Sequence, residues 1–203
     1  MSLAEDHRQQ RRARAHSATR ASILEAARRV AEREGARNLS LRAAAAEAGF
    51  APAALYGYFR SKDELLLALA ADDLSGLARA MRLAAQSAVS GKLSAAAGVA
   101  LEFLENTETI AAASAALPKH AGGSDVERLF NGRLIAALTA LSETLDEHSS
   151  SREGQADVVL IAATLTGLAL LCRSGRLEAL GFRNAELLAR LDRKFSKSSK
   201  DPV

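Results

Sequence analysis

The chain has 203 residues, a net charge of +3, 48% apolar and 25% charged residues, and one cysteine. This composition is ordinary for a globular protein with a packed core, and a single cysteine excludes an internal disulfide. The first twenty residues lack the apolar segment of a signal peptide, and the longest mostly apolar run, residues 158–172, is shorter than the roughly 20 residues that span a bilayer. We therefore expect a cytoplasmic protein with no membrane partner.

Residue types and charge positions narrow the choice further. Alanine, leucine, arginine and glutamate dominate and there are only three prolines, so we expect an all-α fold. Residues 1–62 hold 12 Lys or Arg against 6 Asp or Glu, whereas residues 63–203 hold 15 against 18. A basic first third indicates a polyanionic partner for that part, although the charge alone would equally fit an RNA-binding or membrane-surface arm.

Residues 1–16 are basic and almost without apolar side chains. They contain Arg8, Arg11, Arg12 and Arg14 together with two histidines. We expect a disordered basic arm in the isolated protein. On DNA, such an arm would order along a phosphate backbone or in a minor groove.

A helix is expected from residue 17 to about residue 34, because a serine or threonine can cap its start and Gly35 can end it. Near that end, Arg33 would favour the helix dipole. Apolar residues at i, i+4, i+7 and i+8 predict one face that packs on the elements that follow. The face consists of Ile23, Ala27, Val30 and Ala31.

Two short helices are expected next. Ser40 can cap a helix over residues 41–48, and Gly49 can end it. Pro52 suits the first position of a second helix, which we expect to run to about Phe59. Two short helices joined by a glycine turn are the signature of a helix-turn-helix.

A capping box, Ser61 to Glu64, then opens a long helix. With it, the segment AAAAEAGFAPAALYGYFRSKDELLLAL resembles the N-terminal DNA-binding domain of TetR-type (tetracycline-repressor-like) transcriptional regulators over roughly residues 18–70. The resemblance implies an all-α protein of about nine helices. It also implies a three-helix helix-turn-helix domain over residues 17–62 and a helical effector-binding and dimerisation domain over residues 63–203.

In this family the second short helix enters the major groove, where base edges can be read. Here its first residues are Ala51, Pro52, Ala53 and Ala54, and none of these side chains can hydrogen-bond to a base. Family members commonly have Ser or Thr at the position of Ala51 and often near Ala54, so this helix is limited to contact with thymine methyl groups. Arg42 is the one long side chain placed to bind a guanine.

The helix-turn-helix has more side chains that can bind DNA phosphates than side chains that can bind bases. Backbone oxygens can be bound by hydroxyl and ammonium groups and by the start of the helix at residue 62. Core packing is the alternative for the two tyrosines. Gly57 costs about 1 kcal/mol in a helix relative to alanine. It either permits close approach to the DNA backbone or leaves a recognition helix that stiffens on binding. The expected phosphate set is Ser40, Tyr56, Tyr58 and Lys62.

Six helices are expected in the body, at about 62–87, 93–106, 107–116, 127–147, 155–174 and 185–195. The helix at 155–174 is apolar over most of its circumference, and its small residues at 162, 163, 167 and 169 would allow close approach. With 185–195 it would form the four-helix interface of a homodimer, as the resemblance also implies. The alternative is the central core helix of a monomer.

The resemblance also implies an effector pocket in the body. Aromatic residues make up only 4% of the chain, so a mostly aliphatic cavity and an apolar or amphipathic small-molecule effector are expected. Each candidate lining residue would equally suit an ordinary core. The candidates are Phe103, Thr107, Phe130, Leu134, Leu138, Thr164 and Leu168.

No catalytic motif is present, and the four scattered histidines give no metal-ligand spacing. We expect no catalysis and no metal or cofactor. The sequence predicts a sequence-specific DNA-binding transcriptional regulator: a repressor that binds a palindromic operator as a homodimer and is released by a ligand. The alternative is a helical small-molecule-binding or enzymatic module whose N-terminal helical hairpin is structural. The effector, the operator and the regulated genes cannot be read from the residues.

Overall fold

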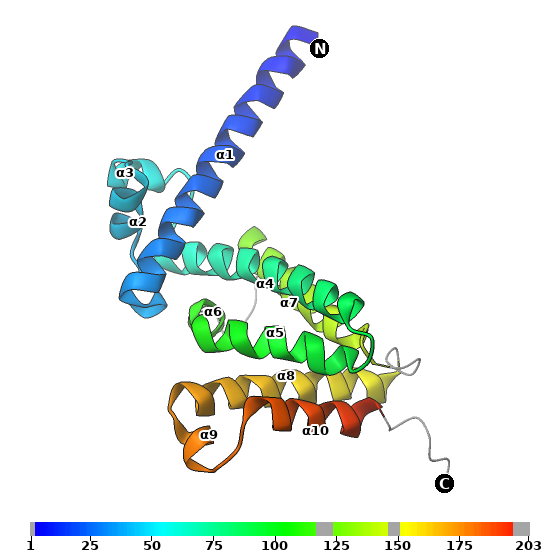
Figure 1. Cartoon of the computed structure of the whole chain (residues 1–203). Coiled ribbons are helices and arrows are strands. Elements are labelled where there is room, and N and C mark those ends of the chain that lie inside the picture. The colour runs from blue at the N-terminus through cyan, green and yellow to red at the C-terminus, as the bar shows by residue number, and fades with distance from the viewer. Residues whose placement is uncertain (1–2, 117–123, 146–150, 197–203) are drawn as a thin grey trace. The chain divides into compact units, whose positions relative to one another are not determined.

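The computed structural model describes residues 3–116, 124–145 and 151–196. Within these ranges the chain forms ten α-helices and one short 3-10 helix, with no strand (Figure 1). The expected all-α class is confirmed, with one helix more than expected. The chain divides into two compact units.

The first unit contains the chain up to Ala70 together with Thr109–Arg128. It consists of α1 (Leu3–Glu34), η1 (Ala36–Asn38), α2 (Leu41–Ala48), α3 (Pro52–Leu55), the first part of α4 (Lys62–Ser87), α6 (Thr109–Ala116) and the first turn of α7 (Asp125–Ser142). The second unit contains Ala71–Glu108 and the chain from Leu129 on. It holds the rest of α4 and α7 with α5 (Lys92–Asn106), α8 (Arg152–Arg173), α9 (Arg176–Ala179) and α10 (Asn184–Ser196).

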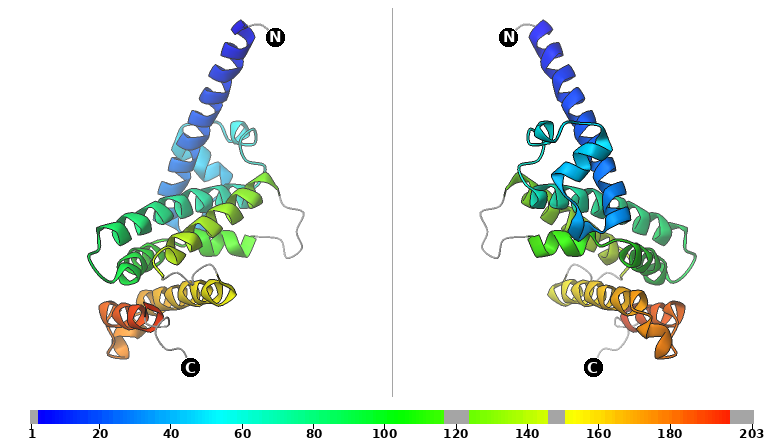
Figure 2. Two further views of the ribbon diagram at one scale, coloured as in Figure 1. Left: turned by 90° about the vertical axis from the view of Figure 1, so that its right-hand side faces the viewer. Right: turned by 90° about the vertical axis from the view of Figure 1, so that its left-hand side faces the viewer.

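Helix α1 begins at Leu3 rather than at residue 17, so residues 3–16 are helical where we expected a disordered arm. These residues include no glycine or proline, and alanine, arginine and glutamine have high helix propensity, so no residue stops the helix from extending toward the N-terminus. The side chains of residues 7–18 are exposed. In both views of Figure 2 this half of α1 extends past α2 and α3 with no other described helix of the first unit beside it.

The apolar face of α1 forms the core of the first unit. The predicted residues of this face are all buried, and they pack with α2, α3 and the start of α4. Three leucines of α4 belong to this core, which explains why the unit extends beyond the expected boundary at residue 62. The buried partners of α1 include Leu39, Ala44, Ala45, Leu55, Phe59, Leu65, Leu66 and Leu69.

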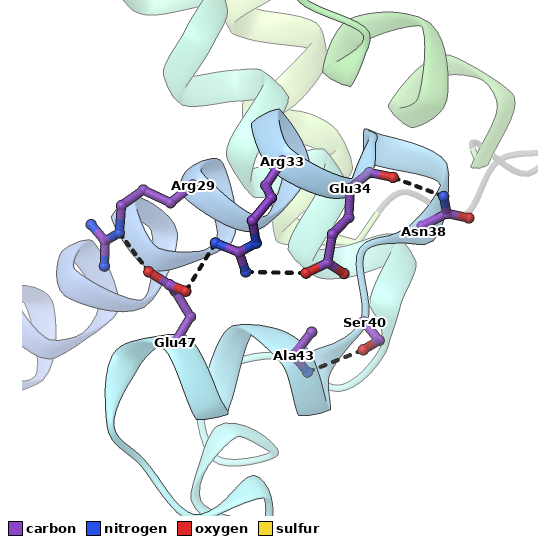
Figure 3. Close-up of polar contacts among 7 residues, drawn as sticks. All are labelled: Arg29, Arg33, Glu34, Asn38, Ser40, Ala43 and Glu47. Carbon is purple, nitrogen blue, oxygen red and sulfur yellow. Dashed lines mark hydrogen bonds and ion pairs between the residues drawn. The ribbon is translucent and has the colours of Figure 1, made fainter.

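Glu47 of α2 connects α2 to α1 outside this core (Figure 3). Its carboxylate accepts a hydrogen bond of 2.8 Å from Nε of Arg29 and one of 3.3 Å from Nη1 of Arg33. The bond from Arg29 is the main reason why the pKa of Glu47 lies below its usual range. Because folding lowers this pKa, the stabilisation is present at neutral pH and is lost as the pH falls through the folded-state pKa. Arg33, expected to act on the helix dipole, also pairs with Glu34 and Glu47.

Both ends of α2 lie where the sequence predicted them. Ser40 is the N-cap, and its Oγ accepts a hydrogen bond of 3.1 Å from the N–H of Ala43. Gly49 follows the last residue with a left-handed φ of 73°. The N–H groups of Gly49 and Phe50 donate to carbonyls of the last turn at 3.2 and 2.9 Å, which is the Schellman arrangement that ends a helix.

Helix α3 ends at Leu55, earlier than the expected end at Phe59. The N–H groups of Gly57 and Tyr58 donate to carbonyls three residues back, at 3.2 and 2.9 Å. The chain therefore continues as a tight turn instead of an α-helix. Glycine loses more backbone freedom in a helix than any other residue, which explains the early end at this position.

In the second unit, α5 packs against α8 and α10. Gly91, the N-cap of α5, has no side chain to cap the helix. Asp192 of α10 supplies the cap instead, because its Oδ1 accepts a hydrogen bond of 3.1 Å from the N–H of Ser94. At the other end of α10, Nδ2 of Asn184 donates to Oε1 of Glu105 at 2.9 Å. These two contacts fix α10 along α5.

Other helix bounds differ from the expectations. Helix α8 begins at Arg152 rather than at residue 155, because Ser151 caps it by accepting the N–H of Gly154 at 3.0 Å. Helix α7 ends at Ser142, before the expected residue 147. Helix α9 was not predicted, because four residues are too few to show a helical period.

We expected no segment long enough to span a membrane, because the apolar run over residues 158–172 is short. Helix α8 corrects this expectation. This helix has 22 residues and is, by length and composition alone, long and apolar enough to cross a membrane. One side of it is buried against α5, and a single helix of this kind is weak evidence for a membrane span.

Gly49→Ala is expected to destabilise the first unit by about 1–2 kcal/mol, because a Cβ on a left-handed residue crowds the following carbonyl oxygen. An added Cβ would meet no atom within 4 Å, so the variant tests backbone strain alone. Chemical unfolding followed by circular dichroism measures the change in the free energy of unfolding.

Gly57→Ala is the matched control, because Gly57 has no left-handed φ and its added Cβ would lie at an ordinary 3.4 Å from the Ala54 oxygen. Alanine leaves the unfolded chain fewer conformations than glycine does, so the stability should stay unchanged or rise by up to about 1 kcal/mol. Equal losses in the two variants would show that the conformation of Gly49 is not the cause.

Candidate nucleic-acid interface

The start of α2 presents two polar side chains in different ways. The Oγ of Ser40 is half-buried and caps α2, although that bond does not use its hydroxyl proton. Arg42 is exposed, and its guanidinium makes no hydrogen bond or ion pair with any residue that the structure describes. A guanidinium in this state offers five donors in a planar fork, which suits a guanine edge or a phosphate.

Helix α3 presents methyl and ring carbon atoms to the outside. Ala51, Pro52, Ala53 and Ala54 are all exposed, while Leu55 is completely buried. Ala51 is the N-cap and provides no side-chain hydrogen bond. Any hydrogen bond from a side chain to a base must therefore come from outside α3, and Arg42 of α2 is the candidate expected from the sequence.

The two tyrosines after α3 have different surroundings. The side chain of Tyr56 is 63% exposed, so the core alternative does not apply to it. Tyr58 is half-buried and packs against the core of the first unit. Its ring also stacks on the imidazole of His16, with ring centroids 4.6 Å apart and planes inclined by 25°. The ring and hydroxyl of Tyr56 are thus accessible to a ligand, whereas the ring of Tyr58 is held in place by its contacts.

Lys62 and the start of α4 are partly engaged within the unit. The Nζ of Lys62 donates to the carbonyl oxygen of Arg37 at 2.5 Å, which leaves two of its three protons for another acceptor. One half of the expected capping box is present, because Oγ of Ser61 accepts the N–H of Glu64 at 3.1 Å. The Glu64 carboxylate accepts the N–H of Arg60, one residue before the cap, at 2.7 Å. These bonds occupy N–H groups that a phosphate would otherwise bind.

Two residues of α1 join this surface through contacts that the sequence did not indicate. One is His16, through its stack on Tyr58. The other is Arg20, whose guanidinium carbon lies 4.9 Å from the ring centroid of Phe59, a cation–π arrangement. The available signal was their spacing of four residues, which places both on one side of a helix. The expectation of a disordered arm up to residue 16 concealed it.

The first unit also contains a cavity of about 430 Å³ beside the starts of α4 and α7. Its lining includes the carboxylates of Asp63, Glu64, Asp125 and Glu127, with Arg60 as the cation among the lining residues. An excess of carboxylates repels a polyanion, so we do not assign this cavity to the nucleic-acid interface.

The expected effector-lining residues lie in the second unit. Phe130 is buried, whereas Thr164 is exposed and its hydroxyl donates to the carbonyl of Leu160 at 2.8 Å, within its own helix. Helices α5 and α8, which carry Phe103 and Leu168, pack together. Among the described residues, no group of three His, Cys, Asp or Glu could hold a metal ion. The remaining candidates are half-buried, namely Phe103, Thr107, Leu134, Leu138 and Leu168.

Helix α8 has a second apolar face, on the side away from α5, that is exposed. Val159, Leu160 and Leu170 are 58%, 57% and 65% exposed. A Cβ added at Gly167 would meet no atom within 4 Å, so no described part of the chain covers this face. The residues of the α8 face are Ala156, Val159, Leu160, Ala163, Gly167 and Leu170.

Helix α10, the other helix expected in a dimer interface, differs from α8. Its apolar residues Leu188 and Leu191 are buried. Its exposed residues include Glu186, Arg190 and Arg193, which are charged. Charged residues are depleted in the centre of protein interfaces, so α10 fits the rim of such an interface better than its centre.

A family model described as bacterial regulatory proteins, tetR family, matches residues 23–69. The matched segment contains the second part of α1, all of η1, α2 and α3, and the start of α4. These elements carry most of the candidate interface. Among curated proteins, none matches this chain.

Solved structures share the fold at low sequence identity. A protein with unknown function from Rhodococcus sp. RHA1 is 23% identical with a TM-score of 0.70, over 88% of this chain and 94% of that chain. The fatty acid degradation regulator FadR from Bacillus halodurans is 18% identical with a TM-score of 0.59, over 88% and 98%. The transcriptional regulator FadR from Bacillus subtilis, in complex with stearoyl-CoA, is 17% identical with a TM-score of 0.59, over 87% and 97%. Residues 23–69, which carry the helix-turn-helix, therefore form a domain of the tetR family of bacterial regulatory proteins.

Proposed function

We propose that the protein is a cytoplasmic, sequence-specific repressor that binds a palindromic operator as a homodimer and is released by a small apolar or amphipathic molecule. The observation that carries this proposal is the exposed surface of α2 and α3, with Arg42 and Tyr56 directed to solvent, in a domain of the tetR family.

On this surface, base reading and phosphate binding are divided between different residues. Arg42 would bind a guanine, because it has an exposed guanidinium without an internal partner among the described residues. The alanines of α3 would contact thymine methyl groups. Tyr56, Lys62 and the hydroxyl of Ser40 would bind phosphate oxygens and set the register of the domain on the duplex. Gly57, exposed beside Tyr56, would allow the chain to approach the DNA backbone closely.

Two copies are needed to read a palindrome, and the α8 face supports a dimer. An apolar face with alanine and glycine at its centre allows another helix to approach closely. A second copy of α8, packed around a two-fold axis, would cover the face with the same residues. The charged side of α10 would then lie at the rim of the four-helix interface.

Release by an effector requires a path from the second unit to the first. Helices α4 and α7 both continue from one unit into the other, so a ligand that shifts either helix in the second unit changes the first. Couplings of this kind are typically worth 1–3 kcal/mol. The half-buried aliphatic candidates of α7 and α8 favour an apolar ligand, and the similar FadR from Bacillus subtilis has stearoyl-CoA bound.

The Arg42→Ala variant tests the base contact. It should weaken binding to a duplex selected from a random-sequence library by roughly 1–3 kcal/mol and relax the preference at one base pair of each half-site. Fluorescence anisotropy with single-base-pair variants of the duplex measures both effects. Arg133→Ala, which removes the same charge from an exposed position of α7, should change neither.

A uniform loss across all duplex variants would show that Arg42 contacts only phosphate. For the wild-type protein, the affinity should fall steeply with salt. A protein that binds no duplex at low salt would refute the proposed function and favour a helical module whose N-terminal hairpin is structural.

The Leu160→Glu variant tests the dimer. A carboxylate in the centre of the α8 face should convert the protein to a monomer, because it would be buried without a partner. Leu83→Glu, on an equally exposed leucine of α4, is the control and should remain a dimer. Light scattering coupled to size exclusion gives both masses, and a dimeric Leu160→Glu variant would place the interface elsewhere.

Stearoyl-CoA tests the effector class. It should lower the affinity for the selected duplex by roughly 5-fold or more, the lower end of typical allosteric coupling. Coenzyme A without the acyl chain is the control and should have no effect, since the expected contacts are aliphatic. An effect of coenzyme A equal to that of stearoyl-CoA would contradict an apolar pocket, and native mass spectrometry of the purified dimer would then identify the ligand that copurifies.

A further inference from the structure

We propose that the N-terminal half of α1 is a second DNA-binding helix, which binds phosphates of the duplex that flanks the operator half-site. It does so through one ridge of side chains, Arg8, Arg12, His16 and Arg20, hereafter the α1 ridge. This inference rests on the proposed DNA-binding function and extends it to a surface outside the helix-turn-helix.

The spacing of the α1 ridge follows from helix geometry. Its members are four residues apart, so they lie along one side of α1 at intervals of about 6 Å. The helix is continuous through all four positions. In the disordered arm expected over residues 1–16, Arg8, Arg12 and His16 would share no side.

The direction of the α1 ridge is fixed by two contacts at its inner end. Arg20 lies over the ring of Phe59 at 4.9 Å, and His16 stacks on Tyr58 at 4.6 Å. Phe59 is completely buried, so the contact at Arg20 is anchored in the core. The ridge therefore faces the segment that follows α3, which is the segment expected on the DNA backbone.

Beyond this inner end, the α1 ridge continues past the helix-turn-helix. Arg12 is one helical turn from His16 and Arg8 a second turn, both with exposed side chains. Figure 1 shows this part of α1 extending beyond α3. A duplex that contacts Tyr56 and α3 would pass along the same side, so the two arginines would meet DNA just outside the half-site.

Groove dimensions decide how this helix can bind. An α-helix with its side chains is about 10–12 Å wide, whereas the minor groove of B-DNA is only about 6 Å wide. The minor-groove binding considered for a disordered arm is therefore excluded for residues 3–16 in their helical form. Phosphates of one strand follow each other every 3.4 Å along the duplex axis, so one ridge step of about 6 Å is close to two phosphate steps of about 6.8 Å.

Arg14 provides a matched control within the same helix. It lies two residues from Arg12, which is about 200° around the helix, so it points away from the α1 ridge. Both side chains are exposed. Replacing either arginine by glutamine removes one charge and keeps a residue of similar helix propensity.

The test compares Arg12→Gln and Arg14→Gln in the full-length dimer. The probes are a 40-base-pair duplex with the selected site at its centre and the same site without its flanks. On the long duplex, Arg12→Gln should reduce the slope of log K against log salt by about 0.9 per protomer, or about 1.8 per dimer. Arg14→Gln should leave the slope at the wild-type value, and on the short duplex both variants should match wild type.

Three outcomes would count against the proposal. If both variants reduce the slope equally on the long duplex, α1 contributes only diffuse charge. If the slope of Arg12→Gln equals that of wild type, the ridge does not contact DNA. A wild-type protein that binds the long and short duplexes equally well would show the same. In each case the steep salt dependence of the wild-type protein would still support the proposed function, which fails only if the wild-type protein binds neither duplex. Circular dichroism of both variants excludes a loss of helix as the cause.

Discussion

The ring of Phe59 is completely buried in the first unit and lies under the guanidinium of Arg20. Leu55, four residues earlier, is completely buried as well. The chain between them is therefore fixed at both ends, and the residues between these two anchors have to pass outside the core. This constraint explains why Tyr56 is exposed and Tyr58 only half-buried, although both belong to the same short turn.

The same constraint explains how a four-residue helix can serve as a recognition element. Such a helix has little stability of its own, because nucleation is unfavourable and few hydrogen bonds form. Its position comes from the core through Leu55 and Phe59 and from the Schellman turn at Gly49. An exposed surface of methyl groups would then be presented rigidly. If DNA is bound there, discrimination among sequences has to come from Arg42 and from the shape and deformability of the duplex.

The parts of the fold that were predicted from the sequence are those encoded by neighbouring residues. Helix α2 was predicted at both ends, because Ser40 and Gly49 act on the turn beside them. The start of α1 was not, because residues 3–16 contain no stop signal and patterns of charge do not distinguish an exposed helix from a disordered arm. In the candidate site, too, features encoded by neighbouring residues were predicted and contacts between distant residues were not. Exposure of Arg42 followed from its place on α2, whereas the stack of His16 on Tyr58 joins residues 42 positions apart, and no local pattern encodes such a contact.

The ion pairs of Glu47 affect the electrostatic field of the first unit as well as its stability. Arg29 and Arg33 are offset by two carboxylates, because both pair with Glu47 and Arg33 also pairs with Glu34. Arg12, Arg42 and Arg60, in contrast, make no ion pair with any residue that the structure describes. The positive potential of the first unit is therefore uneven. Such an uneven field orients the domain as it approaches a polyanion. Helices α1 and α2, which carry Arg12 and Arg42, would then face the DNA first, and fewer encounters would be unproductive.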